Sequence, residues 1–230
     1  EEDKPIASLD FKDSLGALAY SATSKTAYVC CDDRYVSAVP VVEGPVANFG
    51  DSEVVLRMTA KPSTVALSPS GDQCAASGEE GDISVVLLKD KTSVSKLRGQ
   101  RPTSVHLEYD PVGKYLLSAS TSGGIRLWDL GANKEVHKVE IKGDFGEAGR
   151  WQPSWHPDGE FVALPGGSTI TVLERSTWKT AYFIGDNGEH APAIVLTAWS
   201  PNGLYIASVN ADNKLIQIDK LLFSFTTTGV

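Results

Sequence analysis

The residues that come nearest to a chemical site are a histidine and a glutamate two positions apart, His106 and Glu108. Alternate side chains of a strand lie on the same face, so an imidazole and a carboxylate would sit side by side there. Such a pair could begin a metal site, which needs three or four ligands at suitable spacing. The surrounding sequence supplies no recognisable ligand set. We therefore predict a structural pair and no metal site.

Two short patterns resemble fragments of catalytic motifs. Gly143-Asp-Phe-Gly146 resembles the magnesium-binding loop of protein kinases, but the sequence lacks a catalytic His-Arg-Asp loop and a glycine-rich nucleotide loop at the required spacing. Ser93-Val-Ser-Lys96 matches a Ser-x-x-Lys pattern without its companion motifs. We interpret the first as a loop between repeats and the second as a solvated outer strand.

The other histidines and the tryptophans offer no catalytic arrangement either. No histidine has a serine or cysteine placed to become an activated nucleophile; these histidines are His137, His156 and His190. Three tryptophans could stack on bases, but they lie inside or at the ends of expected strands and are interpreted as core residues; these are Trp151, Trp155 and Trp199. We therefore predict no catalytic residue, no cofactor and no enzymatic activity.

Composition narrows the class of partner. The 230 residues carry a net charge of −8, which opposes a phosphate backbone, so strong direct binding to nucleic acid is not expected.

The three cysteines include the neighbours Cys30 and Cys31, which point to opposite faces of a strand and do not suggest a disulfide framework. No apolar run reaches 18 residues, so no membrane-spanning segment is predicted.

A repeated turn organises the chain. Four segments share a large apolar residue, a short spacer containing proline, and a glycine: Leu67–Gly71, Tyr109–Gly113, Trp155–Gly159 and Trp199–Gly203. Successive glycines are 42, 46 and 44 residues apart, which is the period of a four-stranded propeller blade. Proline presets φ and glycine relaxes the backbone where the chain reverses. Each turn therefore predicts a tight hairpin.

Segments of small or apolar residues follow every turn. The segments 115–120 and 161–165 are expected to be central strands. An earlier segment, 15–39, fits the same scheme without the Pro-Gly turn. The predicted fold is all-β, a WD-type β-propeller with about five of an expected seven blades; a β-sandwich is the alternative. We expect a solvated arm over 1–9 and a partial propeller over 10–230, in units of roughly 10–50, 51–92, 93–141, 142–184 and 185–230.

The third unit resembles the consensus WD repeat most closely, over the stretch from Leu97 to the sequence Ile125-Arg-Leu-Trp-Asp129. Two positions depart from the family pattern. Gln100 stands where the family has histidine, and Ser122 stands where it has an aspartate in the turn. The buried Asp-His-Ser-Trp hydrogen-bond network of that family is therefore not expected to form in full.

The order of the units is similar to the N-terminal propeller of a replisome adaptor family, known as acidic nucleoplasmic DNA-binding protein or chromosome-transmission-fidelity adaptor. The similarity is carried by Trp151-Gln-Pro153, by Phe161–Pro165, by Thr169–Trp178 and by Ala198–Ser208. It implies a nuclear scaffold that couples the replicative helicase to DNA polymerase alpha and chromatin factors. It also implies that the full-length protein is a homo-oligomer, assembled through a region that lies C-terminal to this chain.

Two other function classes stay open. Fold alone does not fix function, so the chain could be a generic WD-repeat adaptor in another complex, such as one for ubiquitin ligation or RNA processing. A propeller hydrolase or lyase would need carboxylates or histidines converging on the central channel. The expected inner strands carry alanine, serine and cysteine instead, for example in Cys74-Ala-Ala-Ser77.

Protein partners are expected to dock on loops between blades and between second and third strands, because a rigid scaffold positions such loops. By the repeat register these loops contain eight acidic and three basic residues, so the face should prefer basic peptide segments, with salt-sensitive binding. The acids could instead serve only to keep the loops solvated. The candidate binding residues are Glu79, Glu80, Asp82, Arg101, Asp144, Glu147, Asp186, Glu189 and Asp212.

Overall fold

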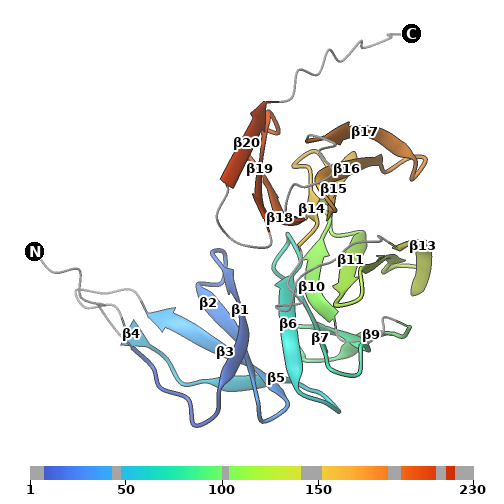
Figure 1. Ribbon diagram of the computed structural model, residues 1–230. Helices are drawn as coiled ribbons and strands as arrows, with labels where there is room; N and C mark the ends of the chain where they lie inside the picture. The colour runs from blue at the N-terminus through green and yellow to red at the C-terminus, as the bar shows by residue number, and fades with distance from the viewer. Residues whose placement is uncertain are drawn as a thin grey trace, which may run out of the picture. The chain divides into compact units, whose positions relative to one another are not determined.

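The computed structural model describes residues 8–42, 48–99, 104–140, 152–185, 193–210 and 216–220. It divides into two compact units, Glu1–Ile141 and Lys142–Val230, and its elements are shown in Figure 1. Every regular element in the described ranges is a β-strand. The all-β prediction is therefore confirmed.

The first unit contains three antiparallel sheets. The first comprises β1 (Leu15–Ser21), β2 (Thr26–Cys31), β3 (Tyr35–Val42), β4 (Asn48–Phe49) and β5 (Glu53–Arg57), with β4 and β5 both paired to β3. The second runs through β6 (Pro62–Leu67), β7 (Gln73–Gly78), β8 (Ile83–Leu87) and β9 (Ser93–Leu97). The third runs through β10 (Ser104–Tyr109), β11 (Tyr115–Ser120), β12 (Gly124–Asp129) and β13 (Lys134–Glu140).

The second unit contains two sheets of the same design. One consists of β14 (Ser154–Trp155), β15 (Phe161–Gly166), β16 (Thr169–Glu174) and β17 (Thr180–Ile184). The other consists of β18 (Ile194–Trp199), β19 (Tyr205–Asn210) and β20 (Ile216–Lys220). Four-stranded antiparallel meanders of this kind are the blades of WD-type propellers. The two segments expected to be central strands are β11 and β15, each the second strand of its sheet.

Four turns between first and second strands repeat one set of hydrogen bonds. In each turn, the residue before proline donates its N–H to the carbonyl of the first residue of the next strand. The glycine N–H donates to the carbonyl of that same residue before proline, and all these bonds are 2.8–3.0 Å long. The glycines have φ between 69° and 79°, a left-handed conformation that costs glycine little. The side chains of Ser68, Asp110 and Ser200 also accept the N–H that starts the following strand, at 3.0, 2.7 and 3.0 Å.

Neighbouring sheets of the first unit pack face to face through apolar side chains. Ala75, Val85 and Leu97 of the second sheet form one buried cluster with Leu107 and Trp128 of the third. Burying apolar surface contributes roughly 25 cal/mol per Å² to stability, and the small side chains of β7 let the sheets approach closely. Within the second unit, Ile170 and Ile206 belong to an equivalent cluster.

The sheets are offset from two of the sequence units. β5 lies in unit 51–92 but pairs with β3, and β9 lies in unit 93–141 but pairs with β8. These two units therefore each begin with the last strand of the preceding sheet. Units 51–92 and 93–141 each contribute strands to two sheets, which links consecutive sheets of the first unit.

Candidate functional site

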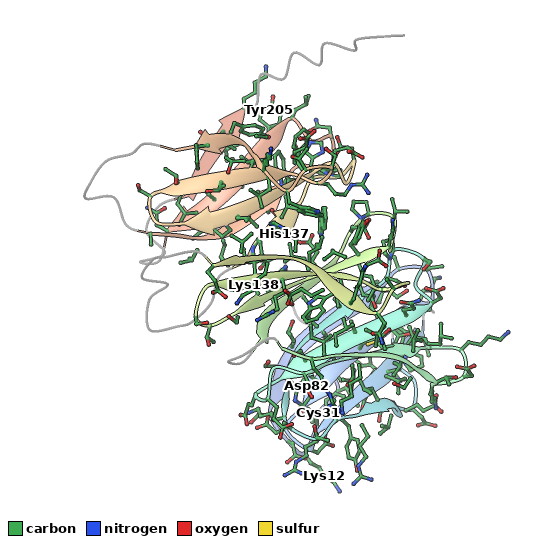
Figure 2. The ribbon with its side chains drawn as sticks, turned by 90° about the vertical axis from the view of Figure 1, so that its right-hand side faces the viewer. Lys12, Cys31, Asp82, His137, Lys138 and Tyr205 are labelled. Carbon is green, nitrogen blue, oxygen red and sulfur yellow. The ribbon has the colours of Figure 1, made fainter. Side chains whose placement is uncertain are left out.

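Three of the candidate binding residues lie together in the turn between β7 and β8. Glu79, Glu80 and Asp82 surround Gly81, whose N–H donates to the carbonyl of Gly78 at 2.8 Å and whose φ is +73°. The carbonyl of Asp82 accepts the Ser77 hydroxyl at 2.9 Å. The turn is therefore fixed by its own hydrogen bonds, and it holds its acidic side chains at the surface (Asp82 is labelled in Figure 2).

Basic and polar side chains from neighbouring segments lie beside these acids. Asp82 Oδ2 lies 3.7 Å from the Arg98 guanidinium, and Glu80 accepts the Thr59 hydroxyl at 3.1 Å. Lys61 forms an ion pair with Asp32 at 2.8 Å. The hydrogen bond to Asp32, with a smaller contribution from the charge of Glu79, raises the pKa of Lys61.

These contacts make the described part of the site a surface of mixed charge. A hollow of about 40 Å³ opens beside it, and Arg57, Glu80, Asp82 and Lys96 are among its lining residues. That space is far below the roughly 300–1,000 Å³ of pockets for small ligands. The hollow is therefore too small to hold a small-molecule ligand of ordinary size.

The remaining candidate residues lie outside the described parts of the chain: Arg101, Asp144, Glu147, Asp186, Glu189 and Asp212. Whether they gather with Glu79–Asp82 stays a prediction. Sequence patterns did not single out Lys61 and Arg98, which pair with acidic groups here. Their position just before β6 and just after β9 was the available signal, because both segments adjoin the β7–β8 turn in a four-stranded meander.

His106 Nε2 lies 3.5 Å from Glu108 Oε2, and no group of three or more His, Cys, Asp or Glu side chains in the described ranges could hold a metal ion. Burial lowers the pKa of His137 on β13 (Figure 2). His190 and the Gly143–Gly146 pattern lie outside the described residues, and Ser93–Lys96 belongs to the outer strand β9.

The buried cysteines are poorly suited to nucleophilic chemistry. Burial raises the pKa of Cys30 and that of Cys74 to about 12 in each case, so both thiols are protonated at neutral pH. The thiolate is the reactive species. These cysteines, both free, act as small apolar side chains in a cluster with Val36 and Val86.

His156 joins two sheets of the second unit. It is 6% exposed, and its Nε2 lies 3.1 Å from the carbonyl oxygen of Gly203, in the equivalent turn of the next sheet. Its Nδ1 lies 2.6 Å from Asp158, and its ring packs edge-on against Trp199 at 4.6 Å. His156 therefore links the turn after β14 to the turn after β18.

Trp155 is buried in the core, and Trp199 is partly buried against it. Trp155 is 5% exposed, Trp199 packs against a buried cluster, and Trp151 lies outside the described residues. Trp128 Nε1 donates to the Ser118 hydroxyl at 2.8 Å. This bond is the Ser-Trp part of the network expected of the consensus WD repeat.

A comparison with protein-family models identifies the repeat itself. Residues 91–129, which run from the end of the β8–β9 turn through β12, match the WD domain, G-beta repeat family. This segment of the chain is a WD repeat. The match covers the repeat that contains the Trp128–Ser118 bond, and it begins just before β9, as the offset between repeats and sheets requires.

Curated relatives extend the similarity over most of the chain. It is 28% identical to WD repeat and HMG-box DNA-binding protein 1 of Xenopus laevis over 88% of its length and 18% of the relative. It is 23% identical to Minichromosome loss protein 1 of Schizosaccharomyces pombe over 78% of its length and 22% of the relative. The chain is therefore homologous to these proteins but spans only about a fifth of them.

A shorter match is to a protein of a different name. The chain is 37% identical to the small ribosomal subunit protein RACK1z of Arabidopsis thaliana, over 42% of its own length and 29% of the relative. Together these likenesses support a protein-interaction scaffold built from WD repeats. A search of the described ranges for long apolar helices that could cross a membrane finds none.

Proposed function

We propose that the protein containing this chain is a non-catalytic scaffold of the nucleus, which couples the replicative helicase to DNA polymerase alpha and to chromatin factors. The observation that carries the proposal is the extent of the likeness to WD repeat and HMG-box DNA-binding protein 1, which covers 88% of the chain. A relative named for minichromosome loss covers 78%. The names of both relatives concern DNA or chromosomes.

Within this scaffold, the β7–β8 turn contacts protein partners. Glu79, Glu80 and Asp82 present carboxylates near Lys61 and Arg98, so a basic residue of a partner can replace Arg98 beside Asp82 and others can approach Glu79 and Glu80. Exposed ion pairs are screened by salt and contribute about 0–1 kcal/mol each. The expected association is therefore weak for each contact, sensitive to salt, and selective for basic segments.

Other properties follow from the same proposal. The chain carries a net charge of −8, so it does not bind DNA strongly by itself, and contact with chromatin runs through protein partners or through other parts of the full-length protein. Homo-oligomerisation is assigned to a region outside this chain. Neither a membrane nor a cofactor takes part.

A second candidate is a generic WD-repeat adaptor in another complex. The match to RACK1z favours it with higher identity, 37%, but over 42% of the chain. A match of that length spans about two repeats, and WD repeats of unrelated function share their turn and strand pattern. We therefore rank this candidate below the replisome scaffold.

Affinity purification from nuclear extract distinguishes the two candidates. The tagged 230-residue chain is used beside its triple variant Glu79→Lys, Glu80→Lys, Asp82→Lys, and captured proteins are quantified by mass spectrometry. Subunits of the replicative helicase and of DNA polymerase alpha should be enriched on the wild-type chain and depleted on the variant. Enrichment of ribosomal or ubiquitin-ligase subunits in their place would favour the second candidate.

A further inference from the structure

The sheet formed by β18, β19 and β20, the fifth in chain order, has one covered face and one open face. Its covered face packs on the sheet before it through Ile194 and Ile206. On the opposite face Ile218 is 68% exposed, and Tyr205 (labelled in Figure 2) is 38% exposed. Exposed apolar patches of this kind mark interaction sites. We call the following side chains the fifth-sheet face: Leu196, Ala198, Tyr205, Ala207, Val209 and Ile218.

The equivalent positions are buried in sheets that a further sheet covers. Ala207 lies four residues after the glycine of the repeated turn and is the cross-strand partner of Ile218. Two other sheets have an alanine and a valine at these places, and all four residues are at most 1% exposed: Ala75 with Val85, and Ala163 with Val172. In each case the next sheet supplies the covering side chains. The fifth-sheet face therefore has the pattern of one half of a sheet-to-sheet interface.

The other half of such an interface is also a repeated feature. On the third sheet, Leu107 and Tyr109 of β10 belong to the cluster that covers the alanine and valine of the second sheet. On the second sheet, Val65 and Leu67 of β6 pack in the same way against the first sheet. A covering sheet thus carries two large apolar side chains, on alternate positions just before the turn that ends its first strand.

The first sheet has such a covering pair, and it is open. Tyr20 of β1 directly precedes Ser21, whose hydroxyl accepts a backbone N–H of the turn, as the serine after the covering pair of the second sheet does. Leu18 is 65% exposed and Tyr20 is 51% exposed. Phe11 and Phe49 pack against buried residues of β2 and β3 on the neighbouring part of this face. They leave Leu18 and Tyr20, which we call the first-sheet face, accessible.

We propose that the fifth-sheet face of one copy of this chain binds the first-sheet face of a second copy. Both faces expose positions that other sheets bury. They are complementary halves, since one carries the pair that is covered in the other sheets and the other carries the pair that covers it. The two copies therefore meet head to tail, through different surfaces. This contact does not involve the acidic turn, and it adds to the oligomerisation proposed for a region outside this chain.

Burial of apolar surface drives the contact, because both faces are apolar. Each face presents fewer residues than the roughly 20–30 per partner of a standard interface, so the association should be weak, with a dissociation constant in the micromolar range. Lys220, the cross-strand partner of Tyr205, is exposed at one end of the fifth-sheet face. A charge at that position can stay in water at the rim of the interface.

Sedimentation velocity of the 230-residue chain, from about 1 μM to about 500 μM, tests the contact. The average molar mass should rise with concentration toward that of two copies. Ile218→Asp and Leu18→Asp should each weaken the association at least about tenfold, because binding would bury a carboxylate without a partner. Both side chains are more than half exposed, so both variants should fold, which far-ultraviolet circular dichroism verifies.

Mixing the two variants separates this contact from any other mode of self-association. Ile218→Asp keeps its first-sheet face and Leu18→Asp keeps its fifth-sheet face, so an equimolar mixture should form one-to-one complexes although each variant alone is monomeric. Val112→Asp is the matched control. Val112 is apolar, 75% exposed and in a turn outside both faces, and Asp158 holds the equivalent position in the fourth sheet. This control should associate as the wild type does.

A wild-type chain that stays monomeric over the whole concentration range would overturn the proposal and leave the fifth-sheet face to a sheet from another part of the full-length protein. A mixture of the two variants that stays monomeric would overturn it too, as would an equal loss of association in Val112→Asp. The proposal does not rest on a role in replication. A failure of that role, seen in affinity purification, would leave the sedimentation results unchanged.

Discussion

Substituting Gly203 by alanine should destabilise the second unit more than any comparable glycine substitution there. Gly203 has φ +69°, and a Cβ built on it would lie 2.2 Å from His156 Nε2. That separation is impossible, so the imidazole must move and lose its 3.1 Å contact with the Gly203 carbonyl. His156 is buried against Trp199 and has little room to move.

The expected cost of Gly203→Ala has three parts. A left-handed alanine costs about 1 kcal/mol, a lost hydrogen bond about 1 kcal/mol, and forcing a side chain into a packed space about 1–3 kcal/mol. The free energy of unfolding should therefore fall by about 3–5 kcal/mol. Gly167→Ala is the matched control, since Gly167 has φ +58° and a Cβ added there would meet no atom within 4 Å. This control should cost about 1 kcal/mol.

Urea unfolding followed by tryptophan fluorescence measures both variants. The double variant His156→Ala with Gly203→Ala removes the clash, so the further cost of Gly203→Ala in the His156→Ala background should fall to that of Gly167→Ala. Such a cycle isolates the coupling between the two positions. Equal destabilisation by Gly203→Ala and Gly167→Ala would refute the reasoning, as would a cost of Gly203→Ala that does not depend on residue 156.

Three further predictions concern the core, the thiols and the acidic turn. Trp128→Phe should lower the free energy of unfolding by about 1–3 kcal/mol, because it removes the hydrogen bond that the Trp128 indole N–H donates to the Ser118 hydroxyl; Ser118→Ala should cost less in the Trp128→Phe background than alone, and additive losses in urea titrations would argue against the bond. At pH 8, Cys30 and Cys74 should resist a thiol-specific reagent in the native protein and react in urea, because burial raises the pKa of each to about 12; rapid native labelling, located by peptide mass spectrometry, would contradict this. Glu79→Lys, Glu80→Lys, Asp82→Lys should change the urea midpoint little, because Glu79 and Glu80 are exposed and half-buried Asp82 makes a 3.7 Å ion pair with the exposed Arg98, while abolishing the salt dependence of partner binding; a salt dependence equal to that of the wild type would exclude the turn as the docking site.

The strands and turns could be predicted from the sequence because they depend on local chemistry. Proline and glycine at fixed offsets specify the hairpins, and alternation specifies strands such as β11 and β15. The pairing of β9 with β8 rather than with its own repeat could not be predicted in this way. It depends on how consecutive sheets share strands, which a period of about 44 residues does not reveal.

The candidate site was predictable only in part. Turn composition identified Glu79, Glu80 and Asp82, but their neighbours Lys61 and Arg98 come from other segments. The contact between His156 and Gly203 spans 47 residues and arises from packing between sheets.

We propose that this chain binds replication proteins through its surface and that the binding is electrostatic. Titration of the purified chain with purified replicative helicase and DNA polymerase alpha subunits, by calorimetry at low and at physiological salt, tests it most directly. We predict saturable binding to at least one of them that weakens as salt increases and is lost in the triple variant at residues 79, 80 and 82. Absence of binding to both partners at low salt, or binding that neither salt nor the triple variant alters, would contradict it.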